Sequence, residues 1–188
     1  MVADVRISGV AFTGSTETAK IINRTLANRD GAIVPLIAET GGQNAMIVDS
    51  TALPEQVVDD VISSAFQSAG QRCSALRVLY LQHDVADKIM DMLKGAVACL
   101  KMGDPLQLST DVGPVIDNEA RQLLIDHVAR MDRQATLIAE VRMPKGCEEG
   151  TFFAPRIYEI TSLDQLTREV FGPVLHIIPV HYTHLTLP

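Results

Sequence analysis

A cysteine and a glutamate in this chain are the residue types needed for covalent catalysis through a thioester. Cys73 lies in the sequence GQRCS, and Glu39 begins the sequence ETGGQN. The neighbouring glycines let the backbone turn tightly or approach a ligand. A thiolate can attack a carbonyl carbon, a carboxylate can activate the water that later releases the acyl group, and Arg72 beside the cysteine would favour the thiolate. The two motifs therefore predict Cys73 as a nucleophile and Glu39 as a general base.

Each of these residues also has a simpler explanation when it is considered alone. Free cysteine is among the most buried residue types, so a lone cysteine is usually structural. A lone glutamate at a strand end is usually a solvated carboxylate. A cysteine hydrolase is a further alternative, in which His83 or His127 would act as the base for Cys73. No pattern in the sequence favours that hydrolase.

The composition limits the classes of protein to which the chain can belong. It has 188 residues, 47% of them hydrophobic, and a formal net charge of −7. This apolar content predicts a folded protein with a sizeable core, and the acidic balance without a basic run predicts no nucleic-acid or membrane partner. The absence of a long apolar stretch or signal sequence, and the three unpaired cysteines, predict a cytoplasmic protein. The histidines lack ligand spacing, so we expect no metal site.

Short apolar runs alternate along the chain with segments of helical period. This alternation predicts an α/β fold with helical crossovers. We expect strands at 10–13, 33–38, 77–81, 135–139, 152–160 and 174–179, and helices at 16–28, 54–69, 84–100 and 118–130. The helix from Pro54 to Ala69 has the strongest apolar repeat, with Gly70 suited to its C-terminal cap. It would place Cys73 on the turn before the next strand.

Four motifs occur in the order found in NAD(P)-dependent aldehyde dehydrogenases: FTGST at 12–16, ETGG at 39–42, GQRC at 70–73 and EVFGP at 169–173. Over about residues 5–180 the chain resembles this superfamily. The segment 39–81 is similar to the L-glutamate γ-semialdehyde (pyrroline-5-carboxylate) dehydrogenase domain of bacterial bifunctional proline-utilisation proteins. The resemblance implies an incomplete aldehyde dehydrogenase fold, the central part of such a domain. Residues 1–40 would end a Rossmann-like cofactor domain, residues 41–180 would form most of an α/β catalytic domain, and residues 181–188 would be a non-native tail.

The resemblance also implies a role for each residue near the reacting atoms. Cys73 would form a hemithioacetal with an aldehyde, and hydride loss would leave a thioester. Glu39 would activate water for thioester hydrolysis. Ser74 would help to hold the distal carboxylate of a γ-semialdehyde substrate. The inert alternative is a binding or scaffold fragment of the same fold, which keeps Cys73 and Glu39 without catalytic activity.

The implied cofactor is NAD, and NADP stays open because the strand end that reads the 2′-position lies upstream of this segment in the family. Gly14 and Ser15 would let the backbone approach a pyrophosphate at a helix N-terminus. Glu169 would bind the nicotinamide ribose hydroxyls, and Phe171 would pack near the ring. The simpler explanations are an N-capped helix and a strand end with a buried aromatic. The implied partners are a small-molecule aldehyde and further copies of a homo-oligomeric parent protein.

Overall fold

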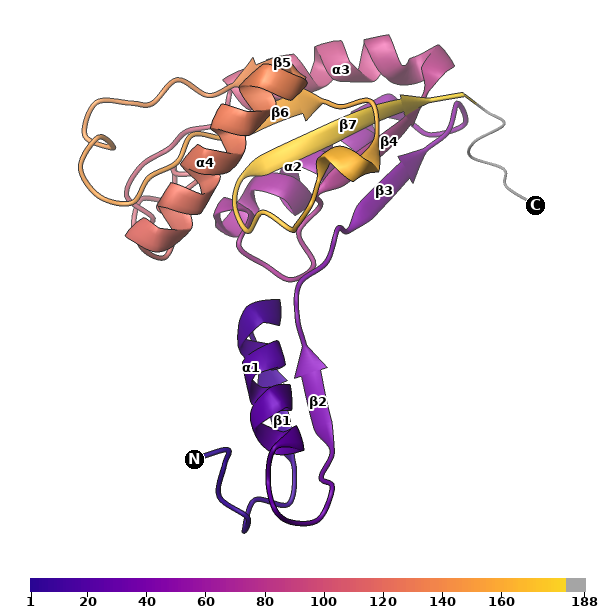
Figure 1. The fold of residues 1–188 in the computed structure, drawn as a ribbon. Helices are drawn as coiled ribbons and strands as arrows, with labels where there is room; N and C mark the ends of the chain where they lie inside the picture. The colour runs from indigo at the N-terminus through magenta and orange to yellow at the C-terminus, as the bar shows by residue number, and fades with distance from the viewer. Residues whose placement is uncertain (182–188) are drawn as a thin grey trace. The chain divides into compact units, whose positions relative to one another are not determined.

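A computed structural model describes residues 1–181, so most of the expected tail lies outside the described residues. The chain divides into two compact units, Met1–Gly42 and Gln43–Pro188 (Figure 1). The domain boundary after residue 40 that the resemblance implies stays a prediction. None of the helices within residues 1–181 combines the length and the apolar composition needed to cross a membrane.

The first unit is a single β-α-β crossover. Strand β1 (Val10–Thr13) leads into helix α1 (Thr16–Ala27), and strand β2 (Leu36–Glu39) returns beside β1. The two strands are parallel, with Thr13 opposite Glu39. Ser15 begins the helix because its hydroxyl accepts a hydrogen bond from the backbone N–H of Thr18 at 3.1 Å. The carboxyl ends of both strands therefore lie together, next to the N-terminus of α1.

The second unit is built on a five-stranded mixed sheet in the order β3-β4-β7-β6-β5. Its strands are β3 (Ala45–Val48), β4 (Val78–Gln82), β7 (Val174–Val180), β6 (Arg156–Glu159) and β5 (Thr136–Glu140). Its helices are α2 (Pro54–Phe66), α3 (His83–Ala98) and α4 (Asn118–Gln134). The pairs β3–β4, β4–β7 and β7–β6 are parallel, and only β5 runs antiparallel to its neighbour. The expected α/β class is confirmed, and the antiparallel edge makes the sheet mixed.

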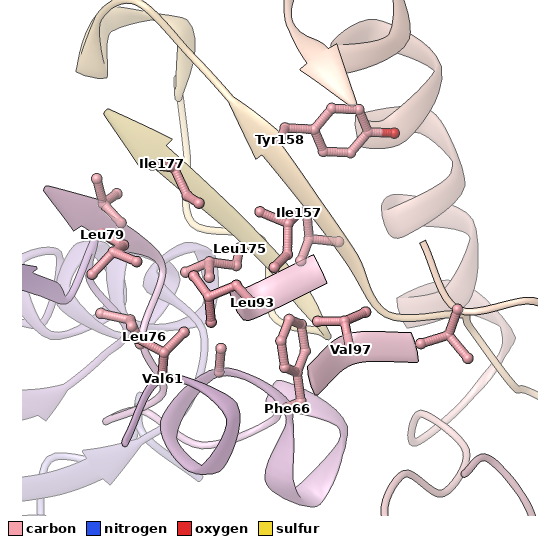
Figure 2. Close-up of a cluster of buried hydrophobic side chains, with 14 of the residues drawn as sticks. Val61, Phe66, Leu76, Leu79, Leu93, Val97, Ile157, Tyr158, Leu175 and Ile177 are labelled. Atoms are coloured by element: carbon pink, nitrogen blue, oxygen red, sulfur yellow. The ribbon is translucent and has the colours of Figure 1, made fainter. Parts of the chain in front are cut away.

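One part of the core lies between one face of this sheet and the helices α2 and α3 (Figure 2). Apolar side chains of the two helices meet those of β4, β6 and β7; the labelled ones include Val61, Phe66, Leu93, Val97, Leu79, Ile157, Leu175 and Ile177. Each large apolar side chain that is fully buried contributes about 1.5–3 kcal/mol. Tyr158 is also fully buried, but its hydroxyl donates to the carboxylate of Asp132 on α4 at 2.6 Å. Helix α4 therefore covers the other face.

Several elements of the second unit differ from the sequence prediction. Strand β6 covers only Arg156–Glu159 of the predicted 152–160, and helix α4 continues to Gln134 beyond the predicted residue 130. Strand β3 was not expected, because its run of four residues is short and, as an edge strand, leaves Ile47 65% exposed. The expected helix from Pro54 to Ala69 ends at Phe66, and Gly70 is not its C-terminal cap. Backbone torsions instead become left-handed, with φ of 54° at Ser68, 52° at Ala69 and 64° at Gly70. The apolar repeat continues to Ala69, so it does not record this change in the backbone.

Candidate active site

The predicted site residues of the second unit gather at one edge of its sheet. Because β3, β4 and β7 are parallel, their amino ends lie at the same edge. Asn44 precedes β3, the Cys73 turn precedes β4, and the segment from Glu169 to Pro173 precedes β7. These three segments are far apart in the sequence, and the parallel sheet brings them together.

Cys73 lies exposed on a tight turn, two of whose carbonyl groups accept hydrogen bonds from the side chain of Asn44. The turn is closed by a hydrogen bond from the backbone N–H of Ala75 to the carbonyl of Arg72 at 3.0 Å. The side-chain amide of Asn44 donates to the carbonyls of Cys73 and Ala75 at 2.6 and 2.9 Å. Cys73 and Ser74 are both exposed, whereas Cys147 is buried. The explanation of Cys73 as a buried structural cysteine is therefore wrong.

Gly70 allows the Cys73 segment and the Glu169 segment to meet backbone to backbone. A Cβ atom at Gly70 would lie 2.3 Å from the carbonyl oxygen of Gly172 and 2.8 Å from that of Ala65. Backbone atoms cannot rotate away as a side chain can, so no other residue fits without displacing one of the segments. The glycine of the GQRC motif is therefore required by its contact with the EVFGP motif.

The side chain of Arg72 contacts helix α2. Its guanidinium donates to the carbonyl of Ser63, in the last turn of that helix, at 3.2 Å. Cations stabilise the C-terminal end of a helix, so Arg72 has a structural use here. Gln71 accepts a hydrogen bond from the backbone N–H of Ile116 at 2.8 Å, which fastens the same segment to the loop before α4.

Arg77 is the residue that sequence reasoning missed. Its side chain is 1% exposed, yet it reaches both motif segments. The guanidinium donates to a carboxylate oxygen of Glu169 at 3.0 Å, to the carbonyl of Gly172 at 3.1 Å and to the carbonyl of Arg72 at 3.3 Å. It also lies 5.3 Å from the ring centre of Phe171. Burial lowers the pKa of Arg77, and the carboxylate of Glu169 opposes that shift. A charged residue at the start of an otherwise apolar strand was the available signal.

A cavity of about 380 Å³ opens beside the Glu169 segment. Glu169 and Phe171 line it from one side, and apolar residues of α4, including Leu123 and Leu124, line it from the other. The carboxylate of Glu169 can accept hydrogen bonds from ribose hydroxyls. The ring of Phe171, which is 45% exposed, can pack against a flat aromatic group beside that ribose. The chemistry of these side chains therefore fits the nicotinamide end of a dinucleotide.

In the first unit, the remaining predicted residues lie at the carboxyl ends of β1 and β2. The backbone N–H of Gly14 donates to the carbonyl of Glu39 at 3.1 Å, and the Glu39 side chain is exposed. A Cβ atom at Gly14 would lie 2.5 Å from the ring of Phe12. Ser15 caps helix α1, as its simpler explanation states, and the N-terminus of a helix favours negative charge. The N-terminus of α1 could therefore bind an anion, and the pyrophosphate role of Gly14 and Ser15 stays a prediction.

Neither candidate histidine is placed to serve Cys73 as a base. His83 follows β4 and Cys73 precedes it, so the length of a five-residue strand, about 16 Å, separates them. The Nε2 of His127 lies 2.9 Å from the Nε2 of His176, and its Nδ1 lies 3.2 Å from the guanidinium of Arg130. The geometry therefore argues against the cysteine hydrolase. Within residues 1–181 no cluster of three His, Cys, Asp or Glu residues could hold a metal ion.

Comparisons with known proteins agree with the four motifs. The model of the aldehyde dehydrogenase family matches residues 1–185. The bifunctional protein PutA of Klebsiella aerogenes is 52% identical over 186 residues, which are 95% of this chain and 14% of that protein. A solved structure of a Bradyrhizobium japonicum Proline Utilization A (PutA) mutant is 58% identical, with a TM-score of 0.92 over 98% of this chain and 19% of that one.

A more distant solved structure has the same fold. The betaine aldehyde dehydrogenase of Staphylococcus aureus, in complex with NAD+, is 28% identical, with a TM-score of 0.90 over 98% of this chain and 37% of that one. The chain thus spans only a small part of the relatives that it matches. On the extent of the family match and the identity to PutA, the chain belongs to the aldehyde dehydrogenase family.

Proposed function

We propose that this chain supplies the nucleophile, the general base and the nicotinamide contacts of a dehydrogenase that oxidises L-glutamate γ-semialdehyde to glutamate. The observation that carries the proposal is the exposed Cys73 on a turn that a buried guanidinium connects to Glu169. The similarity to Proline Utilization A proteins supports proline catabolism as the setting.

Cys73 and Glu39 would act in two successive half-reactions. The Cys73 thiolate attacks the aldehyde carbon, and its own backbone N–H stabilises the resulting oxyanion. NAD, when bound, supplies the acceptor for the hydride that leaves this carbon, and the carbon remains attached to Cys73 as a thioester. Glu39 then takes a proton from water, the water oxygen attacks the thioester, and glutamate departs as the thiolate is restored. Ser74 would hold the distal carboxylate of the substrate throughout.

The proposed cofactor contacts are those that the family resemblance implies. Glu169 would accept hydrogen bonds from the nicotinamide ribose hydroxyls, and Phe171 would pack beside the nicotinamide ring. The first N–H groups of helix α1, after Gly14 and Ser15, would favour the pyrophosphate charge. We propose NAD as the cofactor, with NADP as the alternative. The matched S. aureus enzyme, which is described in complex with NAD+, supports a nicotinamide cofactor.

Replacement of the nucleophile tests the first half-reaction. In a PutA-length protein that carries this segment, Cys73→Ala should abolish NADH formation from the semialdehyde and leave NAD binding unchanged, because no other group can form the thioester. The matched control is Cys99→Ala, since Cys99 is also exposed but follows helix α3. Retention of about a tenth of the rate by Cys73→Ala would refute the assignment.

Replacement of the base tests the second half-reaction. In the same protein, Glu39→Gln should give a burst of NADH followed by a slow steady state, because only thioester hydrolysis needs the activated water. Equal loss in both phases would contradict the role of Glu39. If the unsubstituted protein binds NAD but forms no NADH from any aldehyde, the inert binding fragment becomes the better explanation.

A further inference from the structure

Within residues 1–181, the side chain of Arg77 donates its hydrogen bonds to the Cys73 segment and the Glu169 segment. One nitrogen donates to the carbonyl of Arg72, the residue before the nucleophile, at 3.3 Å, and another donates to the carbonyl of Gly172 at 3.1 Å. The Nε and one terminal nitrogen both lie 3.0 Å from the same carboxylate oxygen of Glu169. Glu169 and Gly172 follow Arg77 by 92 and 95 residues, so these bonds join distant parts of the chain.

A guanidinium can hold the Cys73 segment and the Glu169 segment at once better than any other side-chain cation can. It presents five N–H donors in a rigid plane, whereas a lysine ammonium is a compact point charge with three. The donors of Arg77 reach three acceptors in different directions, and Phe171 lies against the guanidinium at 5.3 Å. Glu169 keeps 16% of its side chain exposed, so its second oxygen can face a ligand while the first is held. The carboxylate is thus oriented before any ligand arrives.

We propose that Arg77 is a positioning residue, which fixes the Glu169 carboxylate and the Cys73 turn relative to each other through its buried guanidinium. The roles of Cys73 and Glu169 in this inference rest on the proposed function, but the mechanical coupling between their segments does not. Loss of the guanidinium should loosen both segments together, since Arg77 is the side chain that donates to the carbonyls of Arg72 and Gly172 and to the carboxylate of Glu169.

A matched arginine in the same sheet offers a control. Arg156 on β6 also pairs with a carboxylate, that of Glu140, and also lies against an aromatic ring, that of Phe153, at 5.8 Å. Its side-chain contacts lie within β5, β6 and the chain before β6, outside the Cys73 and Glu169 segments. Arg156→Lys therefore replaces the guanidinium of a second, more exposed arginine–carboxylate pair, whose side-chain contacts lie outside the site.

Amide hydrogen exchange of the 188-residue chain tests the coupling directly. In Arg77→Lys, peptides covering 71–76 and 168–173 should both exchange about tenfold faster, while peptides from α3 keep their rates. Arg156→Lys should leave both site peptides unchanged. If Arg77→Lys unfolds the chain, Glu169→Gln is the second variant, and it should still accelerate exchange at 71–76. Acceleration confined to one segment, or spread evenly over the whole unit, would overturn the proposal.

Steady-state kinetics separate positioning from a merely structural role. In a PutA-length protein, Arg77→Lys should raise KM for NAD about tenfold and also lower kcat, because both the ribose contact and the nucleophile turn lose their support. A variant that is only less stable would lower kcat through fewer active molecules and leave KM unchanged, and that result would overturn the inference. If the unsubstituted protein shows no dehydrogenase activity, the proposed function fails while the exchange result still decides the coupling.

Discussion

Gly70→Ala should destabilise the second unit far more than an ordinary glycine substitution. Gly70 has φ of +64°, where an L-residue costs about 1–2 kcal/mol. The new Cβ would also lie 2.3 and 2.6 Å from the carbonyl oxygen and carbon of Gly172, and these backbone atoms can yield only if the segment moves. Overpacking of this kind adds about 1–3 kcal/mol, so we expect a total loss of about 3 kcal/mol.

Thermal and urea unfolding of the chain, followed by circular dichroism, measure this loss. About 3 kcal/mol corresponds to a fall in Tm of about 6–12 °C for a domain of this size. The control is Gly95→Ala, because Gly95 lies in helix α3 and its added Cβ would meet no atom within 4 Å. That variant should gain about 0.5–1 kcal/mol from the higher helix propensity of alanine. A Gly70→Ala variant as stable as Gly95→Ala would refute the close contact between the two motif segments.

Three further predictions concern the same unit. Ser68 has φ of 54°, so Ser68→Val should cost about 1 kcal/mol or more in urea unfolding, whereas Ser68→Gly should not destabilise. Asn44→Ala should cost about 1–3 kcal/mol in the same assay, since the carbonyls of Cys73 and Ala75 lose their donor, and Asn44→Asp should not rescue it. Burial lowers the pKa of His127 to about 3 and that of His176 to about 4, so both stay neutral in the folded state. Unfolding releases them to bind protons below about pH 6.5. The free energy of unfolding should therefore fall by about 3 kcal/mol between pH 6.5 and 5, and His127→Gln should flatten that fall.

The hydrogen bonds around the two histidines define their neutral tautomers. The backbone carbonyl of Arg77 can only accept, so the Nδ1 of His176, 3.1 Å away, must carry its proton. The Nε2 of His176 is then an acceptor, and the Nε2 of His127 must donate to it. This leaves the Nδ1 of His127 to accept from Arg130. An added proton on either ring would remove an acceptor from this chain, which is the geometric reason for the expected loss of stability in acid.

Much of the local structure could be predicted from the sequence, because it depends on neighbouring residues. The strand at Val10–Thr13 has the predicted limits, and helix α1 begins at Thr16, where Ser15 supplies the cap. Cys73 lies on the expected turn before a strand. The spacing of apolar residues and a capping hydroxyl involve only neighbouring residues, so both can be recognised in a single sequence.

The features that the sequence could not predict depend on distant residues. Helix α2 ends at Phe66 and Gly70 then passes against Gly172, a contact that no local pattern records. The sequence pattern indicates only that Arg77 begins a strand, because its partner Glu169 lies 92 residues away. The motifs contain the residues at both ends of these contacts. The buried side chain of Arg77, which joins them, can be identified only in the folded structure.

The location of the Cys73 turn explains why side chains, rather than strands, hold it. In open α/β sheets ligands usually bind at the carboxyl ends of strands, and Gly14 and Glu39 of the first unit lie at such ends. The Cys73 and Glu169 segments instead lead into the amino ends of β4 and β7. The carbonyls of an incoming segment lie before the strand ladder begins, so they need donors from elsewhere. Asn44 supplies donors to the carbonyls at positions 73 and 75, and Arg77 supplies them at positions 72 and 172. Two buried or half-buried polar side chains thus replace the hydrogen bonds of a strand, and this makes the turn sensitive to substitutions at residues that need not touch the substrate.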